Sequence, residues 1–270
     1  MPALKRETIS LARFLLAGAG DRSSLNDGPA RTPRAALGER LLVTAVAAWR
    51  RHENAARAAL EETAAELIAY DLAALTARAE RLAFWLNVYN ALALHATLRF
   101  GIRDSIREAP GFFNRAAYRI SGVRFSLNEI EHGILRGNRS PLPGLPLPFS
   151  PGDPRDALAV RPLDPRIHFA LHCATRSCPL PRPYKAETLD ADLDATITAF
   201  LLGGGVEVSG GNVYLSALFD LYRDDFGGEE GVAAFVLRYL PPDAERHAIM
   251  AALRARKITY PPYDWTLPSR

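Results

Sequence analysis

Two cysteines lie close together in one short segment of the chain, at Cys173 and Cys178. A thiol attacks as its thiolate, and a neighbouring arginine or protonated histidine favours that form by lowering the thiol pKa. Arg176 and the histidines just upstream supply such neighbours. Secreted disulfide frameworks use more cysteines, spread along the chain, so two thiols in one loop indicate reactivity or metal binding before a structural disulfide. We therefore expect the functional centre between residues 164 and 178, with Cys173 as its most reactive side chain.

The residues from Arg166 to Cys173 follow the pattern of a β-strand. Side chains alternate at a period of two, with Ile167, Phe169 and Leu171 set against His168, Ala170 and His172. On a strand, His168 and His172 point to the same face, and Cys173 lies where the chain turns. A nucleophile at a strand end is exposed to substrate while its backbone is held. The alternative is that Cys173 is a small buried hydrophobe, and Cys178 is also a candidate redox or metal partner.

A second group of polar residues lies on a predicted helix. Ser126-Leu127-Asn128-Glu129 fits the capping-box pattern, so we expect a helix through Arg136. His132 and Arg136 then share a face, and Glu129 lies one turn before His132, where a carboxylate can orient an imidazole as a general base. The alternative is a solvated helix face with ordinary contacts between successive turns.

Two asparagines lie on a helix that is apolar nearly all the way round, predicted over residues 81–98. Asn87 and Asn90 are three residues apart and therefore share one face. Burying their amides without partners is costly, so they either bind loop backbone across the core or line a polar pocket. We favour the structural role, because rigid support of an adjacent active loop requires amides of this kind.

The other patterns predict the fold class. We expect further helices at residues 9–16, 34–50, 55–70, 189–202, 232–239 and 243–254, two hairpins at residues 118–125 and 206–215, a short strand at 257–260, and a long proline-rich loop at 140–162. The class is α+β, a helix-dominated single domain with a small antiparallel sheet.

The composition limits the kinds of partner. The formal net charge is +3, from arginines scattered among acidic residues rather than from a basic run, so we expect no nucleic-acid partner. No apolar run approaches the roughly 20 residues that a membrane helix needs, so we expect no membrane association. Glu7 and Arg13 interrupt the first apolar stretch, which a secretory signal tolerates poorly. We therefore expect a cytoplasmic protein.

Several of these blocks, in this order, resemble the domain of unknown function 547 family. The matching stretches are Phe84 to Leu92, Ser126 to Arg136, Arg166 to Cys173 with Ser177-Cys178-Pro179, Leu215-Ser216 with Leu218-Phe219, Tyr222, Asp225-Phe226, and Tyr263-Asp264-Trp265. The resemblance runs from roughly Ala79 to Leu267. We therefore expect a core domain of residues 79–270, with an N-terminal helical region of residues 1–78 packed on it.

The family is named for lacking an assigned function, so the resemblance implies sites rather than a reaction. The polar residues that usually occur in the family pattern match His132, Arg136, His168, Cys173 and Tyr184 of this sequence. The position of Cys178 can be serine, which favours Cys173 as a lone nucleophile over a Cys173–Cys178 redox pair. The chain departs from the pattern in having Ala174 where the family prefers glycine and Leu221 where an aromatic residue is usual.

The leading hypothesis is a thiol-dependent hydrolase or transferase with a papain- or transglutaminase-like arrangement of catalytic residues. It would act on an amide, ester or thioester in a small molecule or peptide. Cys173 is the nucleophile, His132 or His168 the base, and Asn90 or Glu131 the orienting group. Orienting or pocket roles are also expected for Asn87, Arg136, Arg166, Arg176 and Tyr184. We expect no cofactor and no disulfide between the cysteines, and we expect His132 and His168 to meet near Cys173.

Two alternatives stay open. A zinc site would use His132, His168, His172, Cys173 and Cys178, although Cys-x4-Cys with two upstream histidines is not a standard structural-zinc spacing. A non-enzymatic module would use the same polar cluster as a ligand or peptide pocket.

Overall fold

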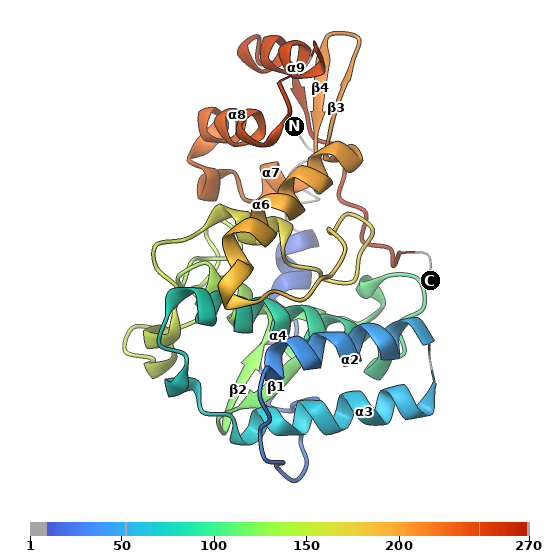
Figure 1. Ribbon diagram of the computed structural model, residues 1–270, viewed down its shortest axis with the longest axis vertical. Coiled ribbons are helices and arrows are strands. Elements are labelled where there is room, and N and C mark those ends of the chain that lie inside the picture. Colours follow the sequence, from blue (N-terminus) through green and yellow to red (C-terminus); the bar gives the residue numbers. More distant parts are fainter. Residues whose placement is uncertain (1–9, 52, 243, 269–270) are drawn as a thin grey trace.

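The long helix α4 (Arg78–Arg99) forms the centre of the lower part of the molecule in Figure 1. The computed structural model describes residues 10–51, 53–242 and 244–268. Because α4 is apolar nearly all round, every residue from Leu82 to Thr97 is buried, as its pattern predicts. Glu80 accepts the backbone N–H of Ala77 at 2.8 Å and so caps the helix start. Helix α2 (Leu37–Arg51) packs against both α4 and α3 (Asn54–Ala65).

The first hairpin, β1 (Ala117–Ile120) and β2 (Val123–Ser126), forms as predicted. Tyr118 pairs with Phe125 across it. The turn at Ser121 and Gly122 has positive φ angles of 52° and 76°, the conformation that two-residue hairpins favour. Short helical turns connect these elements: η1 (Glu66–Ala69), η2 (Leu72–Ala74), η3 (Ile106–Glu108) and α5 (Phe112–Arg115).

The segment after the hairpin is a π-helix, η4 (Glu129–Leu135), rather than the expected α-helix. Its ladder includes the bond from the N–H of Arg136 to the carbonyl of Glu131, at 2.8 Å. Gly133 has no Cβ, and a Cβ there would lie 2.5 Å from ring carbons of the buried Phe149. The proline-rich loop that follows is irregular, as predicted, except for η5 (Pro154–Leu158).

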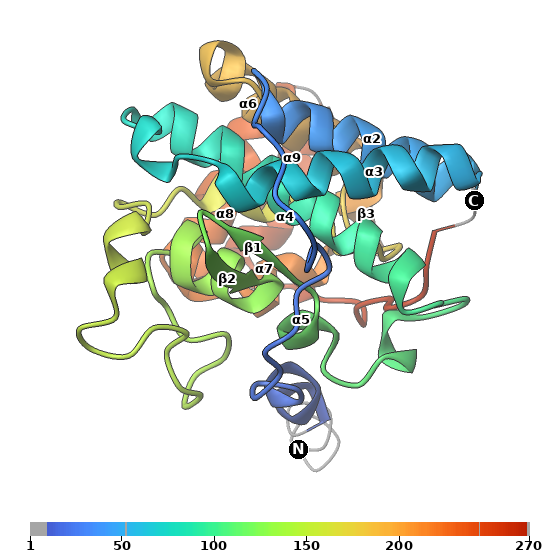
Figure 2. The ribbon, with the colours of Figure 1, turned by 90° about the horizontal axis from the view of Figure 1, so that it is seen from below.

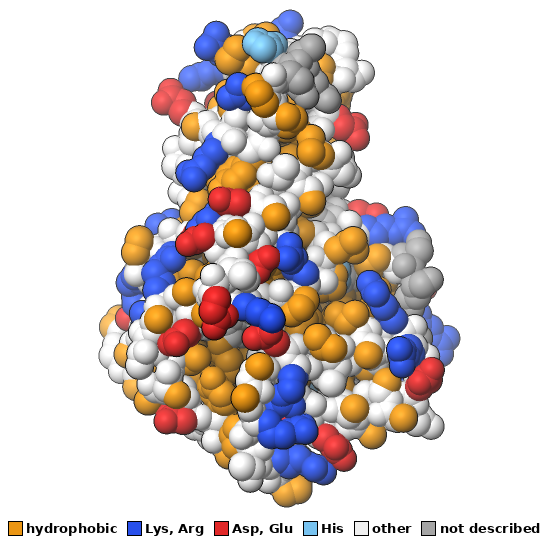
Figure 3. Space-filling view, viewed as in Figure 1, with side chains coloured by type: hydrophobic (Ala, Val, Ile, Leu, Met, Phe, Trp, Pro, Cys, Tyr) orange, Lys and Arg blue, Asp and Glu red, His pale blue; other side chains and the backbone are white. Residues whose placement is uncertain are grey.

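The C-terminal part of the chain runs from the middle of the molecule into the narrower upper part of Figures 1 and 3. Its elements are η7 (Ala186–Thr188), α6 (Leu189–Phe200), η8 (Leu201–Gly205), β3 (Val206–Ser209), β4 (Asn212–Leu215), α7 (Ala217–Leu221), η9 (Arg223–Phe226), α8 (Gly228–Tyr239), α9 (Ala244–Arg254) and β5 (Ile258–Thr259). Of these, α8, α9, β3 and β4 lie in the narrower upper part. Strand β4 pairs antiparallel with β3 and parallel with β5. The predicted hairpin, helices and final strand are confirmed where the chain is described; residue 243, the expected start of α9, lies outside the described residues.

Two hydrophobic clusters hold the chain together. The larger one surrounds α4 and includes α2 and α3; the smaller one lies among α6, β3, β4, α8 and α9. The segment 165–173 belongs to both, because Phe169 packs in the smaller cluster and Ile167 in the larger. These elements confirm the α+β, helix-dominated class.

The described surface carries charges of both signs. Figure 3 shows basic and acidic side chains interspersed over the face it presents. Within the described ranges, no helix has the length and apolar character needed to cross a bilayer.

Candidate functional site

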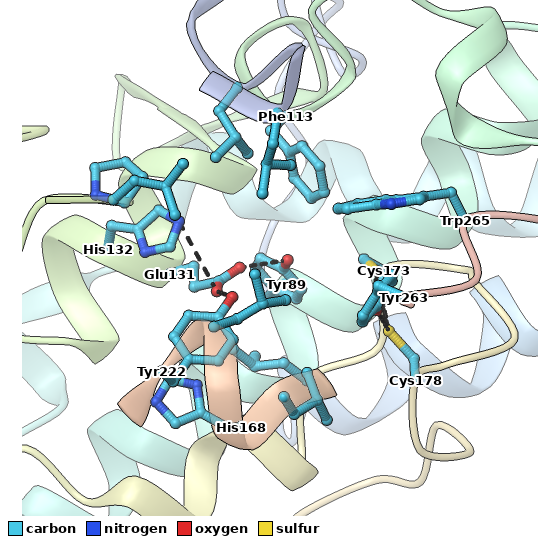
Figure 4. A pocket seen from close by; sticks show the side chains of 17 residues that line it. Tyr89, Phe113, Glu131, His132, His168, Cys173, Cys178, Tyr222, Tyr263 and Trp265 are labelled. Carbon is cyan, nitrogen blue, oxygen red and sulfur yellow. Dashed lines mark hydrogen bonds and ion pairs between the residues drawn. The ribbon is translucent and has the colours of Figure 1, made fainter. Parts of the chain in front are cut away.

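A pocket lies where the two hydrophobic clusters meet, and both cysteines line it (Figure 4). Its wall also contains His132 and His168, so both histidines line the same pocket as Cys173, as expected, and Glu131 lies in that wall as well. The space inside for water-sized groups is about 60 Å³. Leucines and aromatic rings supply most of the remaining wall, so polar chemistry is confined to a few named groups.

The chain that carries the thiols begins as a 3-10 helix, η6 (Pro165–Phe169), and not as the predicted strand. Asp164 caps it by accepting the N–H of Arg166 at 3.1 Å, and proline suits the first helical position. His168 is as buried as its apolar neighbours, so the alternation in sequence does not correspond to two faces. The expected shared face of His168 and His172 is therefore wrong.

Two asparagines of α4 hold the loop after η6 in place. Asn90 donates to the carbonyl of Ala170 at 2.8 Å and accepts the N–H of His172 at 2.7 Å. Asn87 makes the same paired contact with the backbone of Tyr184, at 2.8 and 2.9 Å. The predicted binding of loop backbone across the core is thus confirmed, and it fixes the backbone directly before Cys173.

Ala174 has a positive φ of 63°, next to Cys173. This left-handed conformation costs an L-residue roughly 1–2 kcal/mol and costs glycine almost nothing. The turn after Cys173 therefore explains why glycine is preferred at this position in the family that the sequence resembles.

The two sulfur atoms are in direct contact. Both cysteines are free, and Cys173 Sγ lies 3.0 Å from Cys178 Sγ. Cys178 Sγ also lies 3.2 Å from the backbone N–H of Cys173, 3.0 Å from the hydroxyl of Tyr263 and 3.4 Å from that of Thr175. Four donor groups therefore surround the Cys178 sulfur, which is the environment of a thiolate.

Opposite pKa shifts follow for the two thiols. Burial opposes ionisation of Cys178, but the hydrogen bond from Cys173, the nearby His172, and the hydroxyls of Thr175 and Tyr263 outweigh it and lower the Cys178 pKa to about 5. The contact with Cys178 and burial raise the pKa of Cys173 well above its ordinary value. The expectation of a lowered pKa at Cys173 is wrong, because the donors converge on its partner. Cys178 is also the more exposed of the two.

The other end of the pocket holds a buried carboxylate, Glu131 (Figure 4). It accepts the hydroxyl of Tyr89 at 2.6 Å and that of Tyr222 at 2.5 Å. Burial raises its pKa, but the charge of His132 when protonated and the two phenol donors act in the opposite direction, and the Glu131 pKa is lowered. Glu129, the other candidate carboxylate, instead pairs with Arg155 at 2.7 Å.

His132 has a defined tautomer. Arg136 lies one turn after His132, as predicted, and its Nη1 is 2.8 Å from His132 Nδ1. A guanidinium only donates, so Nδ1 accepts and the ring carries its proton on Nε2. Nε2 lies 3.8 Å from Glu131 Oε1. Burial lowers the His132 pKa to about 4, so the ring is neutral and its accepting nitrogen is already used.

Asp225, on η9, joins the two clusters through ion pairs. Its buried carboxylate accepts Arg136 Nε at 2.6 Å and Nη2 at 3.1 Å, Arg139 Nη1 at 2.9 Å and His168 Nε2 at 2.8 Å. Because Nε2 of His168 donates to this carboxylate, the acceptor nitrogen of the neutral ring is Nδ1, which has no partner among the described residues. His168 stacks on Tyr222, with ring centroids 3.8 Å apart.

The remaining expected site residues lie outside the pocket wall. Arg166 pairs with Asp164, Asp190 and Asp194 beside α6. The backbone N–H of Arg176 donates to Thr266 at 2.8 Å. His172 donates Nδ1 to the carbonyl of Pro179 at 2.7 Å. Over residues 10–51, 53–242 and 244–268, no three His, Cys, Asp or Glu side chains are grouped to hold a metal ion, so the five proposed zinc ligands do not form a set.

Five contributing residues were not predicted as site residues: Tyr89, Thr175, Tyr222, Asp225 and Tyr263. Three of them fall in the C-terminal motifs quoted for the family resemblance, which is the signal by which they were recognisable. Tyr263 reaches the thiols because the C-terminal segment is bonded to their loop, for example from the N–H of Asp264 to Ser177 Oγ at 2.8 Å.

In a comparison with known proteins, the middle of the chain matches a family model. Residues 72–201 match the family described as protein of unknown function, DUF547, and this part of the chain resembles that family, as the motifs indicate. No curated protein and no solved structure matches the chain. The expected papain- or transglutaminase-like arrangement and the boundary at residue 79 stay predictions.

Proposed function

We propose that this chain, which resembles the DUF547 family over residues 72–201, is a thiol-dependent hydrolase or transferase acting on an amide, ester or thioester. One observation carries the proposal: four donors surround the sulfur of Cys178 in the wall of a largely apolar pocket. The thiol of Cys173, the nearby His172 and the hydroxyls of Thr175 and Tyr263 outweigh burial and lower the Cys178 pKa to about 5, so the thiolate is the main form at neutral pH.

The first step is attack of the Cys178 thiolate on the carbonyl carbon. A carbon–sulfur bond forms, the bond to the amine, alcohol or thiol breaks, and the leaving group takes one proton. Cys173 Sγ and the hydroxyl of Tyr263 each lie 3.0 Å from Cys178 Sγ and are the proton donors at hand. We therefore assign Cys178 as the nucleophile, in place of Cys173, which was expected from the sequence, and Cys173 as its proton-donating partner.

In the second step, water or another acceptor attacks the thioester and the thiolate leaves. The acceptor loses a proton to a base, and the base passes it to the deprotonated donor, so that the donor and the Cys178 thiolate are both restored. Of the two expected bases we choose His168, because its Nδ1 is unpaired while Arg136 occupies the acceptor nitrogen of His132. Asp225 takes the orienting role that was expected of Asn90 or Glu131, since it holds the other nitrogen of His168 at 2.8 Å.

Alkylation by iodoacetamide at pH 6.5 tests the thiolate. Most of an ordinary thiol, with a pKa of about 8.5, is protonated at that pH. We expect Cys178 to be labelled much faster than N-acetylcysteine, and Cys178→Ser to leave Cys173 slow. Cys173→Ser is the matched control and keeps fast labelling, because serine can still donate to the sulfur. Labelling of Cys178 no faster than that of N-acetylcysteine rejects the proposal.

Acyl transfer itself is tested with p-nitrophenyl acetate. We expect one acetyl group on Cys178 by intact-mass and peptide mapping, and a burst of nitrophenol that Cys178→Ser removes. Chelator should change neither rate nor stability; thiols protected from alkylation until chelator is added would instead identify a metal site. The chemistry requires reduced thiols, which fits the expected cytoplasmic location.

A further inference from the structure

We infer that the ligand of this pocket carries an amine, bound as an ammonium ion beside Glu131. This inference gives the substrate class of the proposed thiol enzyme. It rests on that proposal only in calling the bound amine a substrate. The ammonium is held by charge and by aromatic rings, so binding does not require a reactive thiol.

Glu131 has no cation in direct contact among the described residues. Arg136 and Arg139 are both bound to the carboxylate of Asp225, and Arg136 attracts Glu131 only at longer range. Glu131, by contrast, receives its two hydrogen bonds from phenols, and no lysine or arginine within the described part of the chain is paired with it. His132, the nearest basic side chain, is neutral because Arg136 donates to its Nδ1.

The Cys178 thiolate lies in the same wall and leaves one negative charge in excess, because Asp225, Glu131 and Cys178 are set against only two arginines among the described side chains. A buried charge without an opposite charge is unfavourable, and a bound cation removes that cost. Each oxygen of Glu131 accepts one hydrogen bond, from Tyr89 or Tyr222, and a carboxylate oxygen can accept two. Glu131 can therefore still accept from the N–H groups of an ammonium ion.

Aromatic rings favour the same ligand. Tyr89, Tyr222, Tyr263, Phe113 and Trp265 all line the pocket, and a cation near a ring face is attracted by the ring quadrupole. Figure 4 shows Tyr263, Trp265 and Phe113 on the side of the pocket away from His132. The cation therefore meets a carboxylate in one direction and ring surfaces in others.

The rest of the ligand is apolar. The helix at residues 10–16 lies beside α5 (Figure 2), and its Leu11 and Leu15 line the pocket together with Leu142. Asn114 holds this helix by donating to the carbonyls of Leu15 and Ala17, at 2.5 and 2.8 Å. The combination selects a small amine with a hydrocarbon body.

Charge-selective labelling of Cys178 tests the inference. The probes are 2-aminoethyl and 2-sulfonatoethyl methanethiosulfonate, which modify thiols by the same reaction but carry opposite charges. The rate at which each probe labels Cys178 is divided by the rate at which it labels N-acetylcysteine. We expect the normalised cation-to-anion ratio to fall about tenfold in Glu131→Gln, as for removal of one nearby charge in a medium of reduced dielectric. Glu129→Gln is the matched control: it removes the same charge on the same segment, where Glu129 faces Arg155 rather than the pocket, and the ratio should stay within about twofold.

Thermal unfolding with n-butylamine, against 1-butanol at equal concentration, tests binding without the thiol. We expect the amine to raise the Tm of the wild type and of Glu129→Gln but not of Glu131→Gln, and 1-butanol to raise none. A labelling ratio unchanged by Glu131→Gln, or equal effects of amine and alcohol on the wild type, overturns the inference. Slow labelling by every reagent together with stabilisation by the amine rejects the thiol enzyme and supports the amine site.

Discussion

Replacing Asp225 by asparagine should produce the largest loss of stability of any single charge change at the site. The carboxylate side chain is fully buried and accepts two hydrogen bonds from Arg136, one from Arg139 and one from His168. Asparagine keeps one acceptor oxygen and turns an N–H₂ group toward donors. Arg136 is then left as a buried cation without its partner.

The magnitude follows from these contacts. Removing one partner of a buried ion pair costs about 3–5 kcal/mol, and a hydrogen bond to a charged group contributes about 1.5–3 kcal/mol. Arg139 is 49% exposed and can turn to water, so the loss is concentrated at Arg136 and His168. We expect Asp225→Asn to lower the free energy of unfolding by about 4 kcal/mol.

Urea unfolding followed by tryptophan fluorescence measures this loss. Asp224→Asn is the matched control, because it removes the same charge from the neighbouring exposed residue and should change stability by less than about 0.5 kcal/mol. A loss below about 1.5 kcal/mol for Asp225→Asn would refute the view that its ion pairs hold the two clusters together.

The pH dependence gives a second check of the same residue. Burial opposes ionisation of Asp225, but His168 and Arg136 outweigh it and lower the pKa well below 3.8. A depressed folded-state pKa stabilises the fold above the unfolded value, and that stability is lost as the pH falls through the folded value. The difference between wild type and Asp225→Asn should therefore be full at neutral pH and shrink below about pH 4.

Three further changes test the surroundings of the site. Tyr263→Phe removes an O–H donor 3.0 Å from Cys178 Sγ. The pH midpoint of alkylation, near 5 in the wild type, should therefore rise by about one unit. No shift would mean that the phenol does not stabilise the thiolate. Ala174→Gly relieves a positive φ and should raise the free energy of unfolding by about 0.5–1 kcal/mol, whereas a loss would contradict the strained turn. Gly133→Ala places a Cβ 2.5 Å from the Phe149 ring and should cost about 1–3 kcal/mol in urea, and a neutral result would show that the ring moves freely.

The elements that the sequence predicts well are those whose pattern is local. The apolar run of α4 and the Ser121-Gly122 turn each fix one conformation with little help from the rest of the chain. The segment after Pro165 shows the limit of such patterns. Its alternation suggests a strand, but Asp164 caps a 3-10 helix there and both kinds of side chain are buried.

The candidate site was located by sequence but its roles were not. The family resemblance predicted that His132 and His168 lie near Cys173, and one pocket contains all three. Which sulfur is ionised depends on donors that arrive from Thr175 and from Tyr263, 85 residues after Cys178 along the chain. Local sequence gives no indication of that contact. The same holds for Asp225, which the fold brings to His168 from a separate helix.

The pocket draws on parts of the chain before, within and after residues 72–201, and this limits how the protein can be shortened. A fragment restricted to residues 72–201 would keep both cysteines but lose Tyr222, Tyr263 and Asp225. The Cys178 sulfur would lose one of its donors, Glu131 one of its phenols, and Arg136 its carboxylate. The matched segment alone therefore does not contain the whole pocket, and assays of the proposed activity require the longer chain.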